Sequence, residues 1–133
     1  MTIKTKNILI DPKNVKLVPT KGTINRGGGI GGESWKIEVN NKRVGVIFIN
    51  LIDELPIGKH PSIQIFLNKT SQGKGIGRIA YKLACDKSKY DIIYAHMRKS
   101  NIASKKAAIA AGFKELKIPK YTQLIMIWKR KRK

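Results

Sequence analysis

Apolar and polar residues alternate with a period of two in several short runs along the chain. Residues 34–40 and 43–50 are two such runs, and Asn40 and Asn41 stand at their junction. Because asparagine tolerates a positive φ, this junction predicts a tight hairpin between two strands. Further strands are predicted for one or both of the runs 8–10 and 15–18, and for residues 62–67, 92–97 and 121–128.

The segment that begins at Ile76 has the period of an amphipathic helix. A second helix is predicted further along, where Ser100 or Asn101 can cap its start and Gly112 can end it. Strands and helices in this order predict an α+β domain. The first helix has one apolar face, formed by Ile76, Ile79, Ala80, Leu83 and Ala84.

Two segments follow neither period. Residues 19–33 hold a proline and a cluster of glycines around Arg26, which predicts a loop. The glycines match a dinucleotide-binding fingerprint by letters, but the residues that follow read as a strand rather than the required helix. Residues 51–61 contain two prolines and predict a linker, so His60 would lie just before the next strand.

Length and composition limit the class of protein. A chain of 133 residues with 41% apolar residues is long enough for one folded domain, predicted over residues 1–128, with a basic tail at 129–133. No apolar run approaches the roughly 18 residues of a membrane span. Cys85, the single cysteine, forms no internal disulfide, and with two histidines it completes no zinc site. We therefore expect a cytoplasmic, reducing setting and no metal.

The charge is high and unevenly distributed. Residues 1–68 carry ten basic and five acidic residues, a net charge of +5, whereas residues 69–133 carry eighteen and three, a net charge of +15. A polyanionic small molecule accounts for only a few of these charges. The basic C-terminal half and tail therefore favour DNA or RNA as a partner, with a solvated lysine-rich surface as the alternative.

The segment 71–78 joins the predicted strand 62–67 to the first predicted helix. Such a junction leaves several backbone N–H groups without an intrahelical partner, and the helix dipole adds partial positive charge. Glycines allow a phosphate to come close to the backbone, and Lys74 and Arg78 add full charges. This arrangement predicts a pyrophosphate site, although the P-loop string itself is absent from the sequence.

Gln72, Gly75 and Gly77 match the pattern Gln/Arg-x-x-Gly-x-Gly/Ala, and a later segment runs from Asn101 to Gly112-Phe113. Together, in this order, they resemble the two signatures of the GNAT superfamily of N-acetyltransferases. The resemblance covers roughly residues 34–128. It implies a mixed central sheet of about six or seven strands, splayed at the coenzyme site, with helices on both faces. Here the helical region that GNAT proteins carry near the N-terminus would be reduced.

The resemblance also implies acetyl-CoA as the cofactor. Its pyrophosphate would bind the glycine-rich segment, and its pantetheine arm would pair with the backbone near Leu67, with Asn101 close by. The residues expected to bind the cofactor are Ile65, Leu67, Gln72, Gly73, Lys74, Gly75, Ile76, Gly77, Arg78, Asn101 and Ser104.

The catalytic groups follow less directly from the sequence. The family commonly places a tyrosine acid seven residues after the signature asparagine, but that position is Ala108 here. A histidine has a suitable pKa for a base near neutral pH, and His96 is expected to be packed rather than catalytic. The candidate catalytic residues are His60, Gln64, Tyr94 and Tyr121.

Three functions remain open at this point. The first is an acetyl-CoA-dependent acetyltransferase whose amine acceptor is macromolecular or associated with nucleic acid. The second is a nucleic-acid base-modifying enzyme, because the phage Mom-type DNA modifiers are similar to GNAT proteins. The third is a non-catalytic module that binds nucleic acid or coenzyme on the same fold. The sequence leaves open the acceptor and whether the chain is a monomer or a homodimer.

Overall fold

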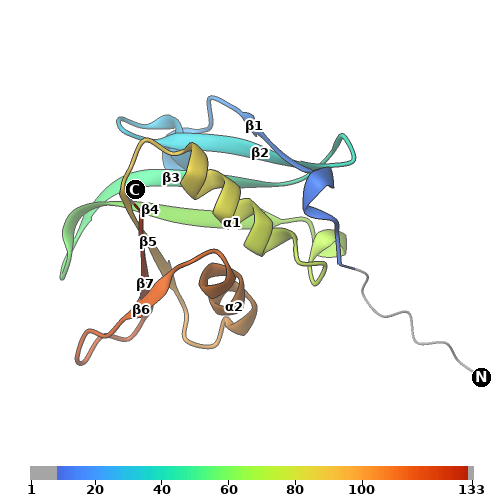
Figure 1. Cartoon of the computed structure of the whole chain (residues 1–133). Coiled ribbons are helices and arrows are strands. Elements are labelled where there is room, and N and C mark those ends of the chain that lie inside the picture. The colour runs from blue at the N-terminus through green and yellow to red at the C-terminus, as the bar shows by residue number, and fades with distance from the viewer. Residues whose placement is uncertain (1–8, 132–133) are drawn as a thin grey trace, which may run out of the picture.

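The computed structural model describes residues 9–131, which form one seven-stranded mixed sheet in the order β1-β2-β3-β4-β5-β7-β6 (Figure 1). Every neighbouring pair is antiparallel except β4 and β5, which run parallel. The predicted mixed sheet is confirmed. The strands are β1 (Val15–Pro19), β2 (Glu33–Val39), β3 (Lys42–Glu54), β4 (Gly58–Leu67), β5 (Ile92–Met97), β6 (Lys114–Leu116) and β7 (Leu124–Lys129).

The predicted hairpin between β2 and β3 is confirmed. Asn40 and Asn41 occupy its turn with φ values of 52° and 67°, the conformation that a two-residue turn of this kind requires. The predicted linker over 51–61 is wrong, because β3 continues through Glu54 and pairs with β4 from Gly58 onward. Two prolines concealed this second hairpin: Pro56 lies in its turn, whereas Pro61 lies within β4.

Both α-helices, α1 (Ile76–Lys87) and α2 (Ile102–Ala110), pack on the same face of the sheet. One buried cluster contains side chains from both helices together with Ile93, Ala95 and Met97, which alternate along β5. On the opposite face, the described chain places only the short helical turn η2 (Ile24–Gly28), which contacts β2 and β3. The expectation of helices on both faces is therefore wrong in this respect. None of the described helices is long and apolar enough to cross a membrane.

The glycine-rich loop between β1 and β2 is folded against the sheet. The side chain of Asn50, on β3, accepts a hydrogen bond from Gly27 N–H at 2.8 Å and donates to the Asn25 carbonyl at 2.8 Å. Gly27 has a φ of 83°, and a β-carbon there would lie 2.1 Å from the Glu33 carbonyl oxygen. Only glycine fits this position.

The segment before β1 contacts the loop that precedes α1. Leu9 and Ile10 form no strand, and Ile8 lies outside the described residues. The Ile10 N–H donates to the Lys74 carbonyl at 2.9 Å. Of the two strands considered for this region, only the one at 15–18 is observed.

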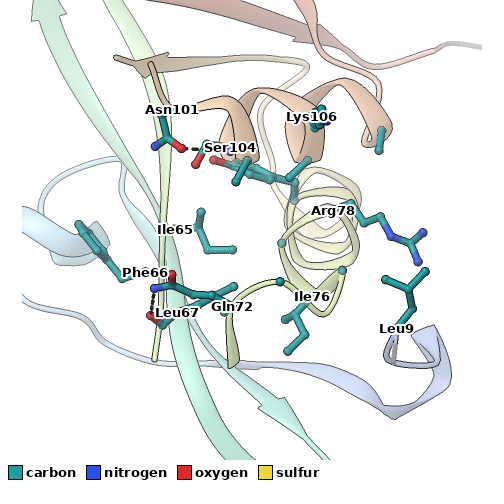
Figure 2. Close-up of a pocket in the computed structure, with 17 residues that line it drawn as sticks. Leu9, Ile65, Phe66, Leu67, Gln72, Ile76, Arg78, Asn101, Ser104 and Lys106 are labelled. Atoms are coloured by element: carbon teal, nitrogen blue, oxygen red, sulfur yellow. Dashed lines mark hydrogen bonds between the residues drawn. The ribbon is translucent and has the colours of Figure 1, made fainter. Parts of the chain in front are cut away.

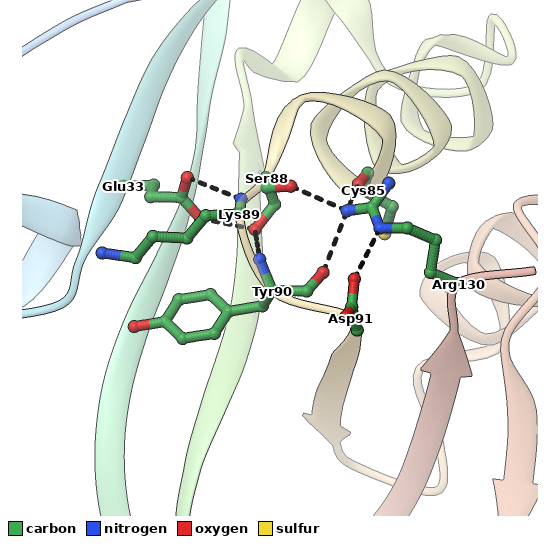
Figure 3. A network of polar contacts seen from close by, with 7 residues as sticks. All are labelled: Glu33, Cys85, Ser88, Lys89, Tyr90, Asp91 and Arg130. Carbon is green, nitrogen blue, oxygen red and sulfur yellow. Dashed lines mark hydrogen bonds and ion pairs between the residues drawn. The ribbon is translucent and has the colours of Figure 1, made fainter. Parts of the chain in front are cut away.

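The C-terminal strand differs from its prediction at both ends. It begins at Leu124 rather than Tyr121, and β6 pairs with it although the sequence analysis did not anticipate β6. Lys129 belongs to β7, and Arg130 is anchored by hydrogen bonds (Figure 3). The predicted basic tail at 129–133 therefore starts two residues too early.

Arg130 connects the end of β7 to the segment between α1 and β5 (Figure 3). Its guanidinium donates to the carbonyls of Cys85, Ser88 and Tyr90 at 3.1, 2.7 and 3.0 Å and to the Asp91 carboxylate at 3.0 Å. Cys85 lies in the last turn of α1 and Ser88 is its C-cap, so their carbonyls stand where intrahelical donors are lacking. Arg130 therefore has a structural role that its place in a run of basic residues concealed.

Candidate active site

The parallel strands β4 and β5 separate after a single pairing. Ser62 and Tyr94 are the only paired residues between them; beyond this point β4 continues beside β3, and β5 continues beside β7. The separation creates an opening on the helical side of the sheet. A cavity of about 740 Å³ lies there, between the end of β4, the loop before α1, and α2 (Figure 2). This volume is in the range of ligand-binding pockets.

The loop before α1 forms one wall of the cavity. Gly73 and Gly75 have φ values of 77° and 78°, a conformation that other residues rarely adopt. Gly75 is the N-cap of α1 and has no side chain to occupy the first amides of the helix. Gln72 fixes the loop to the sheet, because its Nε2 donates to the Leu67 carbonyl at 3.2 Å (Figure 2). The start of α1 therefore lines the cavity without a side-chain cap on its first amides, as an anion site requires.

Helix α2 forms the facing wall. The Asn101 side chain caps the helix by accepting a hydrogen bond from Ser104 N–H at 3.2 Å, which confirms the predicted cap. Arg78 from α1 and Lys106 from α2 also line the cavity. The neighbouring Lys105 does not line it and instead lies 3.9 Å from the Glu115 carboxylate.

The two sequence motifs thus meet at one cavity. Of the residues expected to bind the cofactor, Lys74 is the exception, because it is absent from the cavity lining and its carbonyl accepts from Ile10. The others all line the cavity: Ile65, Leu67, Gln72, Gly73, Gly75, Ile76, Gly77, Arg78, Asn101 and Ser104.

Sequence analysis missed several lining residues, including Leu9, Phe66, Tyr81 and Lys106. Tyr81 is buried and packs edge-on against Phe113 at 5.8 Å between ring centroids. Burial, and secondarily the proximity of Cys85, raises the pKa of Tyr81 to about 12, so its hydroxyl remains protonated at neutral pH. Its spacing of four residues from Gly77 was an available signal, because residues four apart share a helix face.

The predicted catalytic residues lie outside this cavity. His60 is a buried residue of β4 rather than part of a loop, and it packs beside Tyr94 at 4.9 Å between ring centroids. Gln64 is exposed on the same strand. Tyr121 precedes β7 and lines a separate hollow beside β6 and β7. The structure therefore brings His60 and Tyr94 together and leaves Tyr121 apart from them.

His60 also contacts a residue that sequence analysis set aside. The Nε2 atoms of His60 and His96 lie 2.8 Å apart, and His60 Nδ1 lies 2.6 Å from the Gly58 carbonyl oxygen. These histidines are 36 positions apart in the sequence, and only the packing of β4 beside β5 brings them together.

Ala108 lies at the position where the resemblance expects a tyrosine acid. Its side chain is fully buried in the core, whereas Ala107 and Ala110 line the cavity. This position therefore provides no proton donor to the cavity. In the described part of the chain, no group of His, Cys, Asp and Glu side chains is arranged to hold a metal ion.

Comparisons with known proteins agree with this geometry. The family model described as the acetyltransferase (GNAT) family matches residues 20–113. A search of the curated proteins finds no match.

Several solved structures share the fold. They include Mycobacterium smegmatis RimJ in complex with CoA-disulfide (20% identity, TM-score 0.60, covering 74% of this chain and 53% of that chain). YncA from Salmonella typhimurium, a putative acetyltransferase solved with its cofactor acetyl-CoA, has 17% identity and a TM-score of 0.62, covering 78% and 68%. A chimera of the spermidine N-acetyltransferase SpeG from Vibrio cholerae and hSSAT has 19% identity and a TM-score of 0.60, covering 76% and 68%.

The chain thus spans about half the length of the RimJ chain and about two thirds of the other two. At these identities the likeness shows the fold, and the family model covers most of the chain. The chain belongs to the GNAT family of acetyltransferases.

Proposed function

We propose that this protein transfers an acetyl group from acetyl-CoA to an amine. The observation that carries the proposal is the cavity at the separation of β4 and β5, where the loop before α1 and the capped start of α2 meet. The coenzyme's pyrophosphate would accept hydrogen bonds from the amides of residues 73–77. Solved structures of the same fold include proteins in complex with acetyl-CoA or a CoA derivative.

The cavity's charge fits this ligand. Arg78 and Lys106 line it from α1 and α2, and none of the described residues that line it is acidic. The pyrophosphate and 3′-phosphate of coenzyme A require cationic partners, and the helix start adds partial positive charge. The apolar residues Ile65, Leu67 and Ile76 would contact the less polar pantetheine arm.

The acceptor would approach from the opposite face of the sheet. No described α-helix covers that face, which carries η2 and the exposed aromatic Phe66. The Arg26 guanidinium lies over the Phe66 ring at 4.9 Å. Such an open face suits a large acceptor better than a small amine that must be enclosed. The net charge of +15 over residues 69–133 favours an acceptor associated with nucleic acid.

The reaction requires a neutral amine nitrogen to attack the thioester carbonyl. A C–N bond forms, the C–S bond breaks, and the amine gives up a proton to a base while the thiolate acquires one. The sequence analysis named His60 as the candidate base, and in the structure His60 forms a hydrogen-bonded pair with His96. The position of this pair next to Ser62 and Tyr94, the one pairing between β4 and β5, supports a part for it in the proton transfer.

Thermal denaturation with added ligands tests the proposal. Acetyl-CoA at about 100 times its Kd should stabilise the protein by about 2.7 kcal/mol, whereas AMP at equal concentration is the control for adenine binding alone. Thiol release with poly-L-lysine as the acceptor should then depend on both substrates. An unchanged melting temperature with acetyl-CoA would refute the proposed function. Shifts with tRNA or duplex DNA would support the acceptor class, and their absence would favour a free amine or protein lysine.

A further inference from the structure

Two histidines share a hydrogen bond on the face of the sheet that no described α-helix covers. His60 on β4 and His96 on β5 lie next to the pair Ser62 and Tyr94, where the two strands separate. His60 is 2% exposed, and Tyr94 packs against its ring. Because GNAT chemistry would take place where these strands part, the protonation of this pair bears on the reaction.

The hydrogen bonds determine which nitrogens carry protons in the neutral pair. The Gly58 carbonyl can only accept, so the Nδ1 of His60 must be the protonated donor at 2.6 Å. In neutral His60 the Nε2 atom then carries no proton and presents a lone pair. The 2.8 Å contact between the two Nε2 atoms therefore requires His96 Nε2–H to donate to His60.

This assignment leaves one lone pair in the neutral pair, at His96 Nδ1. That atom is buried and has no hydrogen-bond partner among the described residues. An unsatisfied buried acceptor destabilises the protein, so a ligand that donates an N–H to it would remove this destabilisation. Both ring nitrogens of His60 already form hydrogen bonds, so His60 has no nitrogen left to accept a proton directly from a substrate.

We propose that the pair accepts the proton released by the attacking amine, and that His96 Nδ1 is the accepting atom. The amine proton moves to His96 Nδ1, and the proton on His96 Nε2 can pass to His60 Nε2. The added charge is then shared by two imidazoles, while the departing thiolate takes a proton from solvent. This inference rests on the proposed acetyltransferase function. In it His96 is the catalytic residue, and His60 is a positioning residue.

The surroundings favour a neutral His96 before the reaction. Burial, and next the proximity of His60, lowers the pKa of His96 below its ordinary value, whereas Glu54 on β3 opposes this shift. From β7 the residue opposite His96 is the apolar Ile125. A lowered pKa means that His96 is largely unprotonated at neutral pH, as a base must be.

If the histidine pair had a purely structural role, its hydrogen bond alone would matter. The substitution His96→Gln distinguishes this structural role from the proposed catalytic role. In His96→Gln the side-chain amide can still donate to His60 Nε2 but cannot accept a proton as a base. We expect His96→Gln to lower kcat by about 100-fold or more, with poly-L-lysine as the amine. The affinity for acetyl-CoA, measured by calorimetry, should remain unchanged. A kcat within about threefold of the wild type would overturn the proposal, because the hydrogen bond alone would then suffice.

The tautomers can be measured without turnover. Nitrogen-15 NMR of the wild-type protein should show neutral His60 protonated at Nδ1 and neutral His96 protonated at Nε2. A His96 proton located on Nδ1 would overturn the proposal, whatever the activity. If the protein binds acetyl-CoA but acetylates no poly-L-lysine, the acceptor in the proposed function fails, and the tautomer result still decides whether His96 Nδ1 carries the lone pair that a base requires.

Discussion

The Arg130 guanidinium donates to the Ser88 carbonyl at 2.7 Å, which joins the end of the sheet's seventh strand to the segment after α1. Asp91 contributes an ion pair at 3.0 Å to the same guanidinium (Figure 3). The network also extends to β2, because the Ser88 hydroxyl donates to Glu33. Three segments that are distant in the sequence thus meet in one network.

Arg130→Gln should therefore destabilise the fold. Replacement leaves carbonyls at the end of α1 without their charged donor, and hydrogen bonds to charged groups contribute about 1.5–3 kcal/mol. We expect the free energy of unfolding in urea to fall by about 2–3 kcal/mol. Lys131→Gln, at the exposed neighbouring position, is the matched control and should change it by less than about 0.5 kcal/mol. Equal effects of the two substitutions would contradict the role given to Arg130.

Ala108→Tyr tests whether the family's usual acid position can be restored. Ala108 has no exposed surface, so a tyrosine there should overpack the core and cost about 1–3 kcal/mol or more. Ala110→Tyr, on the same helix but at an exposed lining position, should leave the stability of the fold nearly unchanged. The finding that would count against this placement is a stable Ala108→Tyr protein with raised turnover.

Lys106→Met should weaken the binding of acetyl-CoA. Lys106 lines the cavity on the side opposite the loop before α1. Lys105 does not line the cavity and is paired with Glu115. We expect about a three- to tenfold higher Kd for Lys106→Met and a smaller change for Lys105→Met, measured by calorimetry at low salt. If Lys105→Met has the larger effect, the orientation of the coenzyme differs from the one proposed.

Removal of residues 131–133 tests the charge hypothesis without disturbing Arg130. Three basic residues are lost, and each phosphate contact contributes about −0.9 to the slope of log K against log salt on duplex DNA. We expect lower affinity for tRNA and DNA, a slope flatter by up to about 2–3, and unchanged acetyl-CoA binding. If the full-length protein binds neither nucleic acid at about 0.1 M salt, the positive charge is only a surface property.

The cavity could be predicted from the sequence because its signals are local. Gln72, Gly75 and Gly77 lie within six residues, and together with the apolar helix face that follows them they indicate a loop that begins a helix. Asn101 likewise caps the helix that it begins. Such short-range patterns depend little on the tertiary arrangement when the elements around them also fit, and the structure brings both segments to one cavity.

The paired histidines and the arginine clamp could not be predicted in the same way. His60 and His96 meet only because β4 lies beside β5, and Pro61 disguised the strand that carries His60. Arg130 sits in a run of basic residues, where composition indicates a solvated tail. Its partners are 39 to 45 positions earlier in the chain. Contacts of this range depend on the fold rather than on any local pattern.

Calorimetric titration of acetyl-CoA into wild type, Gly75→Ala and Gly75→Glu tests the central claim most directly. Gly75 has a φ of 78°, and any β-carbon there would lie 3.1 Å from Arg78 Nε and from Leu9 Cδ2. Both variants therefore share the same backbone strain, and only Gly75→Glu adds a carboxylate where the pyrophosphate should lie. We expect one coenzyme per chain, a modest loss for Gly75→Ala, and a loss of at least about 100-fold for Gly75→Glu, about 2.7 kcal/mol. Equal affinities for Gly75→Glu and Gly75→Ala would contradict coenzyme binding at this loop.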